Sequence, residues 1–256
     1  MIRQKRVLAV IPARFGSTRF PGKPLADIAG KSMTQRVFEQ VERASSIDFV
    51  TVATDDERIV EHVKTFGGNA VLTSSEHPSG TDRCFEALQL QQEQFDIVIN
   101  VQGDEPFIHP EQIEKVAHCF DDEEVRLATL VKPIDDPDEH FESGMVFVAL
   151  DKEMNALYFS RSVIPFINNA ENLRAEDHPV YHEHVGIYGY RRDALAEITK
   201  LEQSKLERSE SLEQLRWLEN GFKIRVSSST HASHCIDTPS DLENVLKLID
   251  EGLIKL

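Results

Sequence analysis

Residues 7–24 of this 256-residue chain read VLAVIPARFGSTRFPGKP. The run Val7 to Ile11 is wholly apolar and rich in Val and Ile, and it stops at Pro12 and Arg14. It is too short to cross a bilayer, and its flanks differ from those of a secretory signal, so a buried strand is the better interpretation. We therefore predict that this run is the first strand of a sheet and that a loop at its carboxyl end follows.

The alternation of apolar runs and helical spacing continues from this strand. Further strands are predicted at 49–53, 70–73, 96–101 and 127–131. Apolar residues recur at helical spacing over 33–44 and 59–66, and Pro110 opens a helix that reaches Phe120. Short, nearly continuous apolar strands between amphipathic helices are typical of a largely parallel sheet, so the predicted class is α/β.

The alternation breaks after Val131. Three strands with no long helix between them are predicted at 145–150, 156–160 and 181–190, which indicates a small antiparallel insert over 133–192. The polar stretch 168–178 is predicted to be a surface loop. A helix at 211–220, a strand at 222–227 and a helix opened by Pro239 then restore the α/β pattern, so we expect one domain over 1–256.

The composition narrows the class of protein. A formal net charge of −16 argues against nucleic acid and anionic membrane surfaces as partners, because both bind clustered cations. No apolar run approaches the roughly 20 residues that span a bilayer. Cys84, Cys119 and Cys235 form no Cys-x-x-Cys pair, so neither a disulfide framework nor a zinc ribbon is indicated, and a cytoplasmic location is expected.

The loop after the first strand is cationic although the chain is acidic. It contains Gly16 and Gly22 among Arg14, Arg19 and Lys23. Glycine backbone N–H groups approach phosphate closely, and Arg and Lys add charge, so this loop is a candidate triphosphate site. Its spacing is not that of a Walker A loop, which disfavours a P-loop kinase. The alternative is a solvated turn between strand and helix.

Two carboxylates are candidate metal ligands. The predicted strand 96–101 ends in Gln102-Gly103-Asp104-Glu105-Pro106, which places Asp104 at the carboxyl end of a central strand. Mg²⁺ usually takes one or two carboxylates together with substrate phosphates, and Asp237 is a candidate second ligand. The alternatives are that Asp104 is a turn residue and that Asp237 caps the helix that follows it.

These segments together resemble the 3-deoxy-manno-octulosonate cytidylyltransferases, or CMP-Kdo synthetases, which activate Kdo for lipopolysaccharide assembly. The residues that carry the resemblance are 11–24 (IPARFGSTRFPGKP), 52–55 (VATD), 79–83 (SGTDR), 100–106 (NVQGDEP), 156–161 (ALYFSR), 184–191 (HVGIYGYR), 212–216 (LEQLR) and 237–239 (DTP). The resemblance implies a three-layer, Rossmann-like nucleotide-diphospho-sugar transferase fold, and a homodimer to which the antiparallel insert contributes.

The resemblance also implies a role for each matching residue. The nucleotide would be bound by Arg14, Ser17, Lys23 and Gln102, and Mg²⁺ by Asp104 and Asp237. Lys23 and the two metal ligands would form the catalytic group. The acidic sugar would be bound by Arg83, Arg161, His184, Tyr188, Glu213 and Gln214. The implied reaction is in-line attack of the sugar's anomeric hydroxyl on the α-phosphate of CTP. On a regular strand, His184 and Tyr188 share one face and Val185 lies on the other.

The chain departs from the family pattern at three places. It has Glu142 to Val148 where the family commonly has Asn-Pro-Asn and a Val-Lys-Val strand, Pro78 in place of Gln, and Glu183 in place of a basic residue. An 8-amino form of Kdo is therefore an alternative sugar. A sialate cytidylyltransferase is disfavoured by the Phe-Pro-Gly-Lys-Pro run of the first loop. A non-catalytic nucleotide-binding regulatory protein on the same fold is the alternative from another class.

Overall fold

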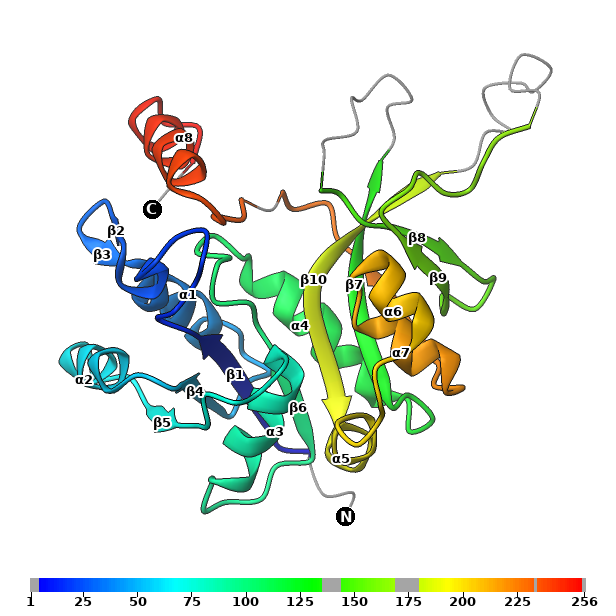
Figure 1. Ribbon diagram of the computed structural model, residues 1–256, viewed down its shortest axis with the longest axis horizontal. Coiled ribbons are helices and arrows are strands. Elements are labelled where there is room, and N and C mark those ends of the chain that lie inside the picture. The colour runs from blue at the N-terminus through cyan, green and yellow to red at the C-terminus, as the bar shows by residue number, and fades with distance from the viewer. Residues whose placement is uncertain (1–4, 135–143, 169–179, 233, 255–256) are drawn as a thin grey trace.

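The computed structural model describes residues 5–134, 144–168, 180–232 and 234–254. Its centre is a nine-stranded sheet in which seven strands lie in the order β11-β7-β10-β6-β1-β4-β5, while β8 pairs with β10 and β9 (Figure 1). The strands of this sheet are β1 (Val7–Ala13), β4 (Phe49–Thr54), β5 (Ala70–Leu72), β6 (Ile97–Asn100), β7 (Leu127–Ile134), β8 (Phe147–Leu150), β9 (Ala156–Ser160), β10 (Tyr181–Arg191) and β11 (Ile224–Ser228). A separate hairpin is formed by β2 (Asp27–Ile28) and β3 (Lys31–Ser32).

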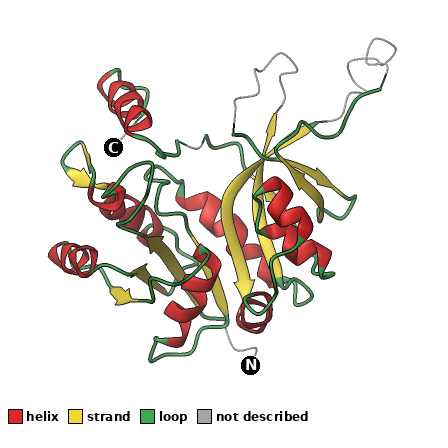
Figure 2. Ribbon diagram, in the orientation of Figure 1, coloured by secondary structure: helices red, strands yellow, loops and turns green. Residues whose placement is uncertain are grey.

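Helices cover both faces of the sheet and make three layers (Figure 2). The helices of one face, together with the C-terminal helix, are α1 (Met33–Glu42), α2 (Glu57–Thr65), α4 (Pro110–His118) and α8 (Pro239–Asp250). The helices of the other face are α3 (Gly80–Gln89), α5 (Arg192–Ile198), α6 (Lys205–Glu210) and α7 (Gln214–Glu219). In the part of the chain that is described, no helix has the length and apolar character required to cross a membrane.

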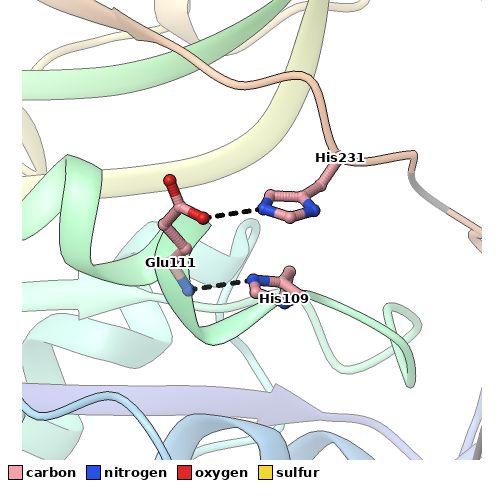
Figure 3. A group of neighbouring side chains, drawn as sticks. All are labelled: His109, Glu111 and His231. Atoms are coloured by element: carbon pink, nitrogen blue, oxygen red, sulfur yellow. Dashed lines mark hydrogen bonds and ion pairs between the residues drawn. The ribbon is translucent and has the colours of Figure 1, made fainter.

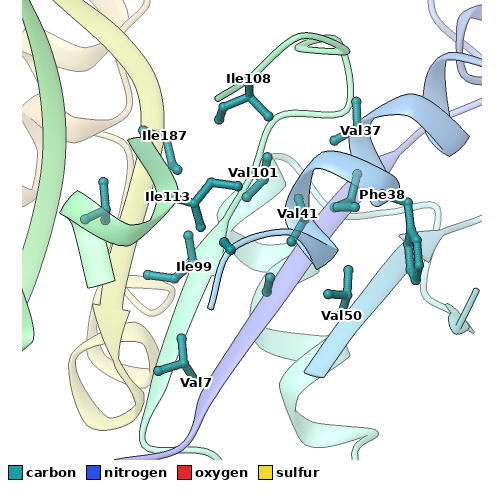
Figure 4. Close-up of a cluster of buried hydrophobic side chains, with 14 of the residues drawn as sticks. Val7, Val37, Phe38, Val41, Val50, Ile99, Val101, Ile108, Ile113 and Ile187 are labelled. Carbon is teal, nitrogen blue, oxygen red and sulfur yellow. The ribbon is translucent and has the colours of Figure 1, made fainter. Parts of the chain in front are cut away.

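Strand β1 shows why the opening segment is apolar throughout. It pairs in parallel with β4 on one side and β6 on the other. Ala9 and Ile11 pack in the cluster under α1 and α4, whereas Leu8 and Val10 pack under α3 and α5. The first of these clusters includes Val37 of α1 (Figure 4). A central parallel strand that is buried on both faces needs apolar residues at every position, so it lacks the alternation of a half-exposed strand.

Strand β10 connects the antiparallel region to the main sheet. The antiparallel strands predicted in 133–192 are present as β8, β9 and β10, and β10 also lies between β6 and β7 and pairs antiparallel with both. The 133–192 boundaries remain a prediction. Residues 135–143, with Glu142, and residues 169–179, with most of the predicted surface loop, lie outside the described parts of the chain.

Helix α3 was not predicted from the sequence. Its start is marked by Ser79, whose hydroxyl accepts a hydrogen bond from the backbone N–H of Asp82. A serine cap of this kind stabilises a helix by about 1 kcal/mol. The short helices α5 and α6 were also not predicted, because six or seven residues are too few to show a clear helical period.

Helix α8 packs apart from the two main clusters. Its Val245 lies in a small cluster with Ile28 of the β2–β3 hairpin, Met33 of α1 and Ile236. Figure 1 shows this helix beyond the hairpin, joined to β11 by a long connection. The C-terminal helix therefore packs against elements that lie around the first loop.

Candidate functional site

Two loops meet at the carboxyl ends of β1 and β6. These strands are parallel neighbours, and the backbone N–H of Val101 donates to the carbonyl of Val10 at 3.0 Å, so the segments that follow both strands leave the sheet at one edge. Gly103 is needed at this contact, because a Cβ at its position would lie 2.5 Å from the carbonyl oxygen of Pro12. The glycine of the Asn-Val-Gln-Gly-Asp-Glu-Pro segment therefore lets residues 102–106, here called the acidic elbow, lie directly against the cationic loop.

A cleft of about 430 Å³ lies between these loops and the start of α3. Six of the residues predicted for nucleotide, metal and sugar line it: Arg14, Ser17, Lys23, Arg83, Gln102 and Asp104. Open α/β sheets bind ligands at this edge, outside the carboxyl ends of their strands. The structure thus brings the predicted nucleotide residues together around one opening.

Lys23 joins the two predicted metal ligands. Its Nζ lies 2.8 Å from Oδ2 of Asp104 and 3.1 Å from Oδ1 of Asp237, although these residues come from distant parts of the chain. Burial lowers the pKa of Lys23, but the attraction and hydrogen bonds of the two carboxylates outweigh burial and raise it. The side chain is therefore a charged ammonium at neutral pH.

The segment that carries Asp237 is anchored to the acidic elbow. The backbone N–H of Ile236 donates to the carbonyl of Asp104 at 3.0 Å. Arg19 adds a second cation, with two guanidinium nitrogens 3.0 and 3.3 Å from the carboxylate of Asp237. Arg19 was counted among the cations of the loop but was not assigned a site role from the sequence. Its contact depends on the position of α8, for which the local sequence has no signal.

Asp104 and Asp237 fit a divalent cation. Their carboxylate oxygens and the sulfur of Cys235 lie within 4.8 Å of one another. Burial and the neighbouring carboxylates raise the pKa of Cys235, so its thiol is neutral and a poor ligand. The donors that remain are two hard carboxylates, which is the set that Mg²⁺ prefers. Thr238, rather than Asp237, caps α8. This removes the alternative that Asp237 serves as the cap.

The remaining residues of the first loop have distinct surroundings. Arg14 is exposed, and its Nη2 donates to the carbonyl of His77. The hydroxyl of Ser17 accepts from the backbone N–H of Phe20 at 3.4 Å. Gly22 adopts a left-handed φ of 74° that favours glycine, and its N–H donates to the carbonyl of Phe15 at 3.0 Å. The loop is therefore closed on itself, with Arg14 toward solvent.

Arg83 is buried, unlike the other cations of the cleft. Its side chain is 0% exposed, and its guanidinium donates to Thr73 Oγ1 at 2.7 Å and to Asp55 Oδ2 at 3.3 Å. Burial lowers its pKa despite the charge of Asp55. Arg83 thus lies in the wall of the cleft, and its ion pair with Asp55 connects the segments 79–83 (SGTDR) and 52–55 (VATD).

His184 and Tyr188 form a second group on β10. Their rings lie 5.2 Å apart, while Val185 belongs to the cluster on the opposite face, as the strand period predicts. The hydroxyl of Thr129 donates to the carbonyl of Ile187 at 2.7 Å, so His184 Nε2, 2.9 Å from the same hydroxyl, must be the donor in that contact. Nδ1 of His184 is then an acceptor. Burial lowers the pKa of His184 to about 3, so the ring is neutral.

Glu213 connects α7 to the start of α3. Its carboxylate accepts hydrogen bonds from Ser79 Oγ and Thr81 Oγ1, each at 2.9 Å, and lies 3.0 Å from Arg216 Nη2. Burial raises the pKa of Glu213, and the two hydroxyls partly offset the shift. Ser79 and Thr81 belong to the segment 79–83 (SGTDR), but neither is among the site residues predicted from the sequence.

The two remaining residues predicted to bind the sugar, Gln214 and Arg161, lie close to Glu213. Gln214 is buried at the first position of α7. Arg161 is exposed, and its Nε donates to the carbonyl of Glu210 at 2.7 Å. The predicted sugar set is therefore divided. Arg83 is in the cleft wall, His184 and Tyr188 are on β10, and Glu213, Gln214 and Arg161 are around α6 and α7.

Known proteins resemble this chain over most of its length. The family model described as cytidylyltransferase matches residues 8–224. A protein of Parabacteroides distasonis named 3-deoxy-manno-octulosonate cytidylyltransferase is 51% identical over 249 residues, which are 95% of this chain and 98% of that protein. A protein of Bacteroides thetaiotaomicron with the same name is 53% identical over 242 residues, 93% of this chain and 96% of its own length.

Solved structures show the same relationship. A structure described as CMP:2-keto-3-deoxy-manno-octonic acid synthetase complexed with CTP superposes with a TM-score of 0.88 at 43% identity and covers 97% of this chain and 100% of its own. A putative glucose-1-phosphate thymidylyltransferase from Bacillus anthracis superposes with a TM-score of 0.64 at 15% identity, covering 98% of this chain and 97% of its own. The second comparison shows a shared fold alone.

Proposed function

Because the chain belongs to the 3-deoxy-manno-octulosonate cytidylyltransferase family of nucleotidyltransferases, we propose that it transfers CMP from CTP to the anomeric hydroxyl of Kdo and releases pyrophosphate. The observation that carries the proposal is the contact of Lys23 with both Asp104 and Asp237 beside the cationic first loop. This contact places one cation that could bind phosphate and two carboxylates that could bind a metal ion next to each other at the cleft, as the proposed reaction requires.

The first loop binds the triphosphate of CTP in this proposal. The exposed guanidinium of Arg14 and the ammonium of Lys23 provide positive charge, while the hydroxyl of Ser17 and the backbone of the loop provide hydrogen-bond donors. Gln102 lines the same cleft. These groups hold the α-phosphate for in-line attack by the sugar hydroxyl, so their contribution to catalysis is positioning and charge neutralisation.

Asp104 and Asp237 hold Mg²⁺ in this proposal. The ion, when bound, neutralises charge on the phosphates during the transfer. Lys23 keeps the two carboxylates close together before the substrates arrive, because its ammonium contacts both of them. The phosphates of CTP then compete for this ammonium. Lys23 is thus proposed to pass from the carboxylates to the phosphates as the nucleotide enters.

The sugar lies toward β10 and α7 in the proposal. Neutral His184 offers its Nδ1 as an acceptor for a sugar hydroxyl, and Tyr188 lies beside it. Arg161 has the planar guanidinium that suits a carboxylate, and Glu213 and Gln214 stand at the start of α7. We also infer from the family that the product serves lipopolysaccharide synthesis in the cytoplasm and that the enzyme is a homodimer.

The 8-amino form of Kdo is the second candidate substrate. A cavity of about 620 Å³ next to His184 is lined by three carboxylate residues, Glu105, Glu183 and Asp241, together with Lys132. An ammonium group on the sugar would be favoured there by the carboxylates. The cavity also includes Gly144, Met145 and Val146, from the segment in which this chain departs from the family pattern.

The test is to measure pyrophosphate release from CTP and Mg²⁺ with Kdo, 8-amino-Kdo or sialic acid supplied separately. We expect release with Kdo, and preference for the amino sugar would establish the alternative. Asp104→Ala and Asp237→Ala should each lower the rate by about 10²-fold or more. Asp121→Ala, at an exposed aspartate that does not line the cleft, is the control. No release of pyrophosphate from CTP with any of the three sugars would instead support a non-catalytic nucleotide-binding protein.

A further inference from the structure

A second group of potential metal ligands lies outside the cleft. It consists of His109, Glu111 and His231, and their ligand atoms lie within 4.8 Å of one another (Figure 3). His109 and Glu111 come from the start of α4, and His231 comes from the connection between β11 and α8. The two imidazole rings are stacked, with centroids 3.7 Å apart and planes inclined by 11°.

The side chains of this group are in contact through a ring stack and hydrogen bonds. Nε2 of His231 lies 2.9 Å from Oε2 of Glu111, and Nδ1 of His109 accepts a hydrogen bond from the backbone N–H of Glu111 at 3.3 Å. Figure 3 shows a ring nitrogen of His231 directed at the carboxylate of Glu111 and a ring nitrogen of His109 directed at the backbone nitrogen of Glu111. Since Nδ1 of His109 accepts this hydrogen bond, it is unprotonated and its lone pair is engaged in the cap of α4, so the cap must open for Nδ1 to bind an ion.

We propose that His109, Glu111 and His231 form a second metal site, which takes a transition-metal ion of the Zn²⁺ class and is separate from the carboxylate pair in the cleft. Two imidazoles and one carboxylate are a recurring ligand set for such ions, whereas Mg²⁺ favours oxygen ligands alone. The stacked rings must turn for their lone pairs to meet at one ion. His109 and Glu111 are exposed and His231 is half-buried, so this rotation meets little packing resistance.

The site would connect the two segments that carry the cleft carboxylates. His109 lies shortly after Asp104 in the chain, and His231 lies shortly before Asp237. The connection is already held by two contacts, from Lys115 Nζ to the carbonyl of Ser228 at 2.8 Å and from Ile236 N–H to the carbonyl of Asp104 at 3.0 Å. His231 lies between these contacts, so a bound ion would add a clamp between α4 and the connection to α8.

The test is direct titration of the metal-free protein with Zn²⁺ against a chromophoric chelator. The background should be Cys235→Ser with Asp237→Asn, because Cys235, Asp104 and Asp237 are the other cluster among the described residues that offers ligands to Zn²⁺. One bound Zn²⁺ is expected in this background. His231→Ala and Glu111→Gln should each weaken its affinity by at least about tenfold.

His109→Asn is the matched variant for the third ligand. Asparagine is a good N-cap, so it keeps the start of α4 while removing the imidazole. His118→Ala is the control, because His118 also lies beside a carboxylate, Asp121, but has no third ligand in the described structure. It should leave the affinity unchanged. Zn²⁺ should raise the unfolding temperature of the background protein and of the His118 control, but not that of His109→Asn or His231→Ala.

Co²⁺ provides a second readout, since its visible absorption reports nitrogen ligands and a low coordination number. Unchanged Zn²⁺ affinity in both His109→Asn and His231→Ala, or no Zn²⁺ bound in the background protein, would overturn the proposal. None of these measurements uses CTP or a sugar. The outcome is therefore independent of the proposed transferase activity.

Discussion

At the scale of single residues, Lys23 has two proposed roles, one at the carboxylates and one at the phosphates of the nucleotide. Its ammonium lies between two carboxylates that would otherwise repel each other across the cleft. The same ammonium is one of the few cations near the proposed triphosphate position in a chain with a net charge of −16. We therefore propose that the place between the carboxylates is a stored position, which the ammonium leaves for the phosphates when the nucleotide binds.

Substitution of Lys23 should separate these two roles. In Lys23→Met, we expect the rate of pyrophosphate release to fall by about 10²-fold or more, because a charged group at the phosphates is lost. The same variant should bind Mn²⁺ more tightly than the wild-type protein when no nucleotide is present, since the carboxylates lose their internal cation. Isothermal titration with Mn²⁺ measures this. Lys31→Met, which removes a lysine paired with Glu39 instead, is the control. Equal Mn²⁺ affinities of Lys23→Met and wild type would contradict the stored position.

His184 should make stability depend on pH. Its pKa is about 3 in the folded chain, against an ordinary value of 6.5, because burial disfavours the charged ring. Between these values the unfolded chain binds a proton that the folded chain does not, so this residue lowers stability as pH falls through that window and has no such effect above it. In His184→Asn, the slope of unfolding free energy against pH should decrease by up to about 1.4 kcal/mol per pH unit. Urea unfolding at several pH values measures it, and parallel curves for variant and wild type would refute the assignment.

At the scale of elements, the approach of two loops depends on one glycine. In Gly103→Ala, the new Cβ would meet the backbone oxygen of Pro12, which no side-chain rotation relieves. We expect a loss of about 1 to 3 kcal/mol in unfolding free energy and a weaker metal affinity, because Asp104 shifts with the elbow. Gly16→Ala is the matched control for stability, since a Cβ there meets nothing within 4 Å. Equal unfolding free energies for the two variants would show that the elbow has room to move.

Helix α3 contributes to the site through its first turn. Ser79 caps the helix and also donates to Glu213, and Thr81 donates to the same carboxylate. The segment 79–83 (SGTDR) therefore starts the helix, binds the carboxylate of a buried ion-pair network and forms part of the cleft wall. This helix, between the predicted strands 70–73 and 96–101, is not among the elements predicted from the sequence, although its capping serine belongs to the segment 79–83 that carries the family resemblance.

At the scale of the whole molecule, the site depends on how α8 is attached. Asp237 immediately precedes the cap of this helix, and α8 is held by a small cluster with Ile28 and Met33 rather than by the main core. Positions in that cluster should therefore affect the site more than they affect global unfolding. The relative position of the two carboxylates therefore depends on the packing of α8 in this cluster.

Val245→Ala tests this coupling. Val245 is 5% exposed, and the loss of its two methyl groups should loosen α8. We expect faster hydrogen exchange of the α8 amides and a higher KM for CTP, with little change in the global unfolding midpoint. Val98→Ala, at a fully buried position of β6, should instead lower the midpoint. A lower midpoint with unchanged exchange in α8 would show that the helix is part of the main cooperative unit.

The sequence by itself determined the elements whose periodicity is strong and the positions of polar residues at their ends. The apolar run Val7 to Ile11 specified a strand buried on both faces, and the strand before Asp104 specified a carboxylate at a sheet edge. These features are local, because they follow from the repeat of side chains along a strand or helix. The resemblance to the family likewise came from residue identities within short segments.

Only the tertiary structure decided which of these residues meet. It placed Lys23 between Asp104 and Asp237, buried Arg83 against Asp55 rather than leaving it free in the cleft, and brought His109 beside His231. It also set β10 between β6 and β7. Such contacts depend on strand order and on the packing of a distant helix. Those depend on the burial of the whole chain, which no local pattern of residues records.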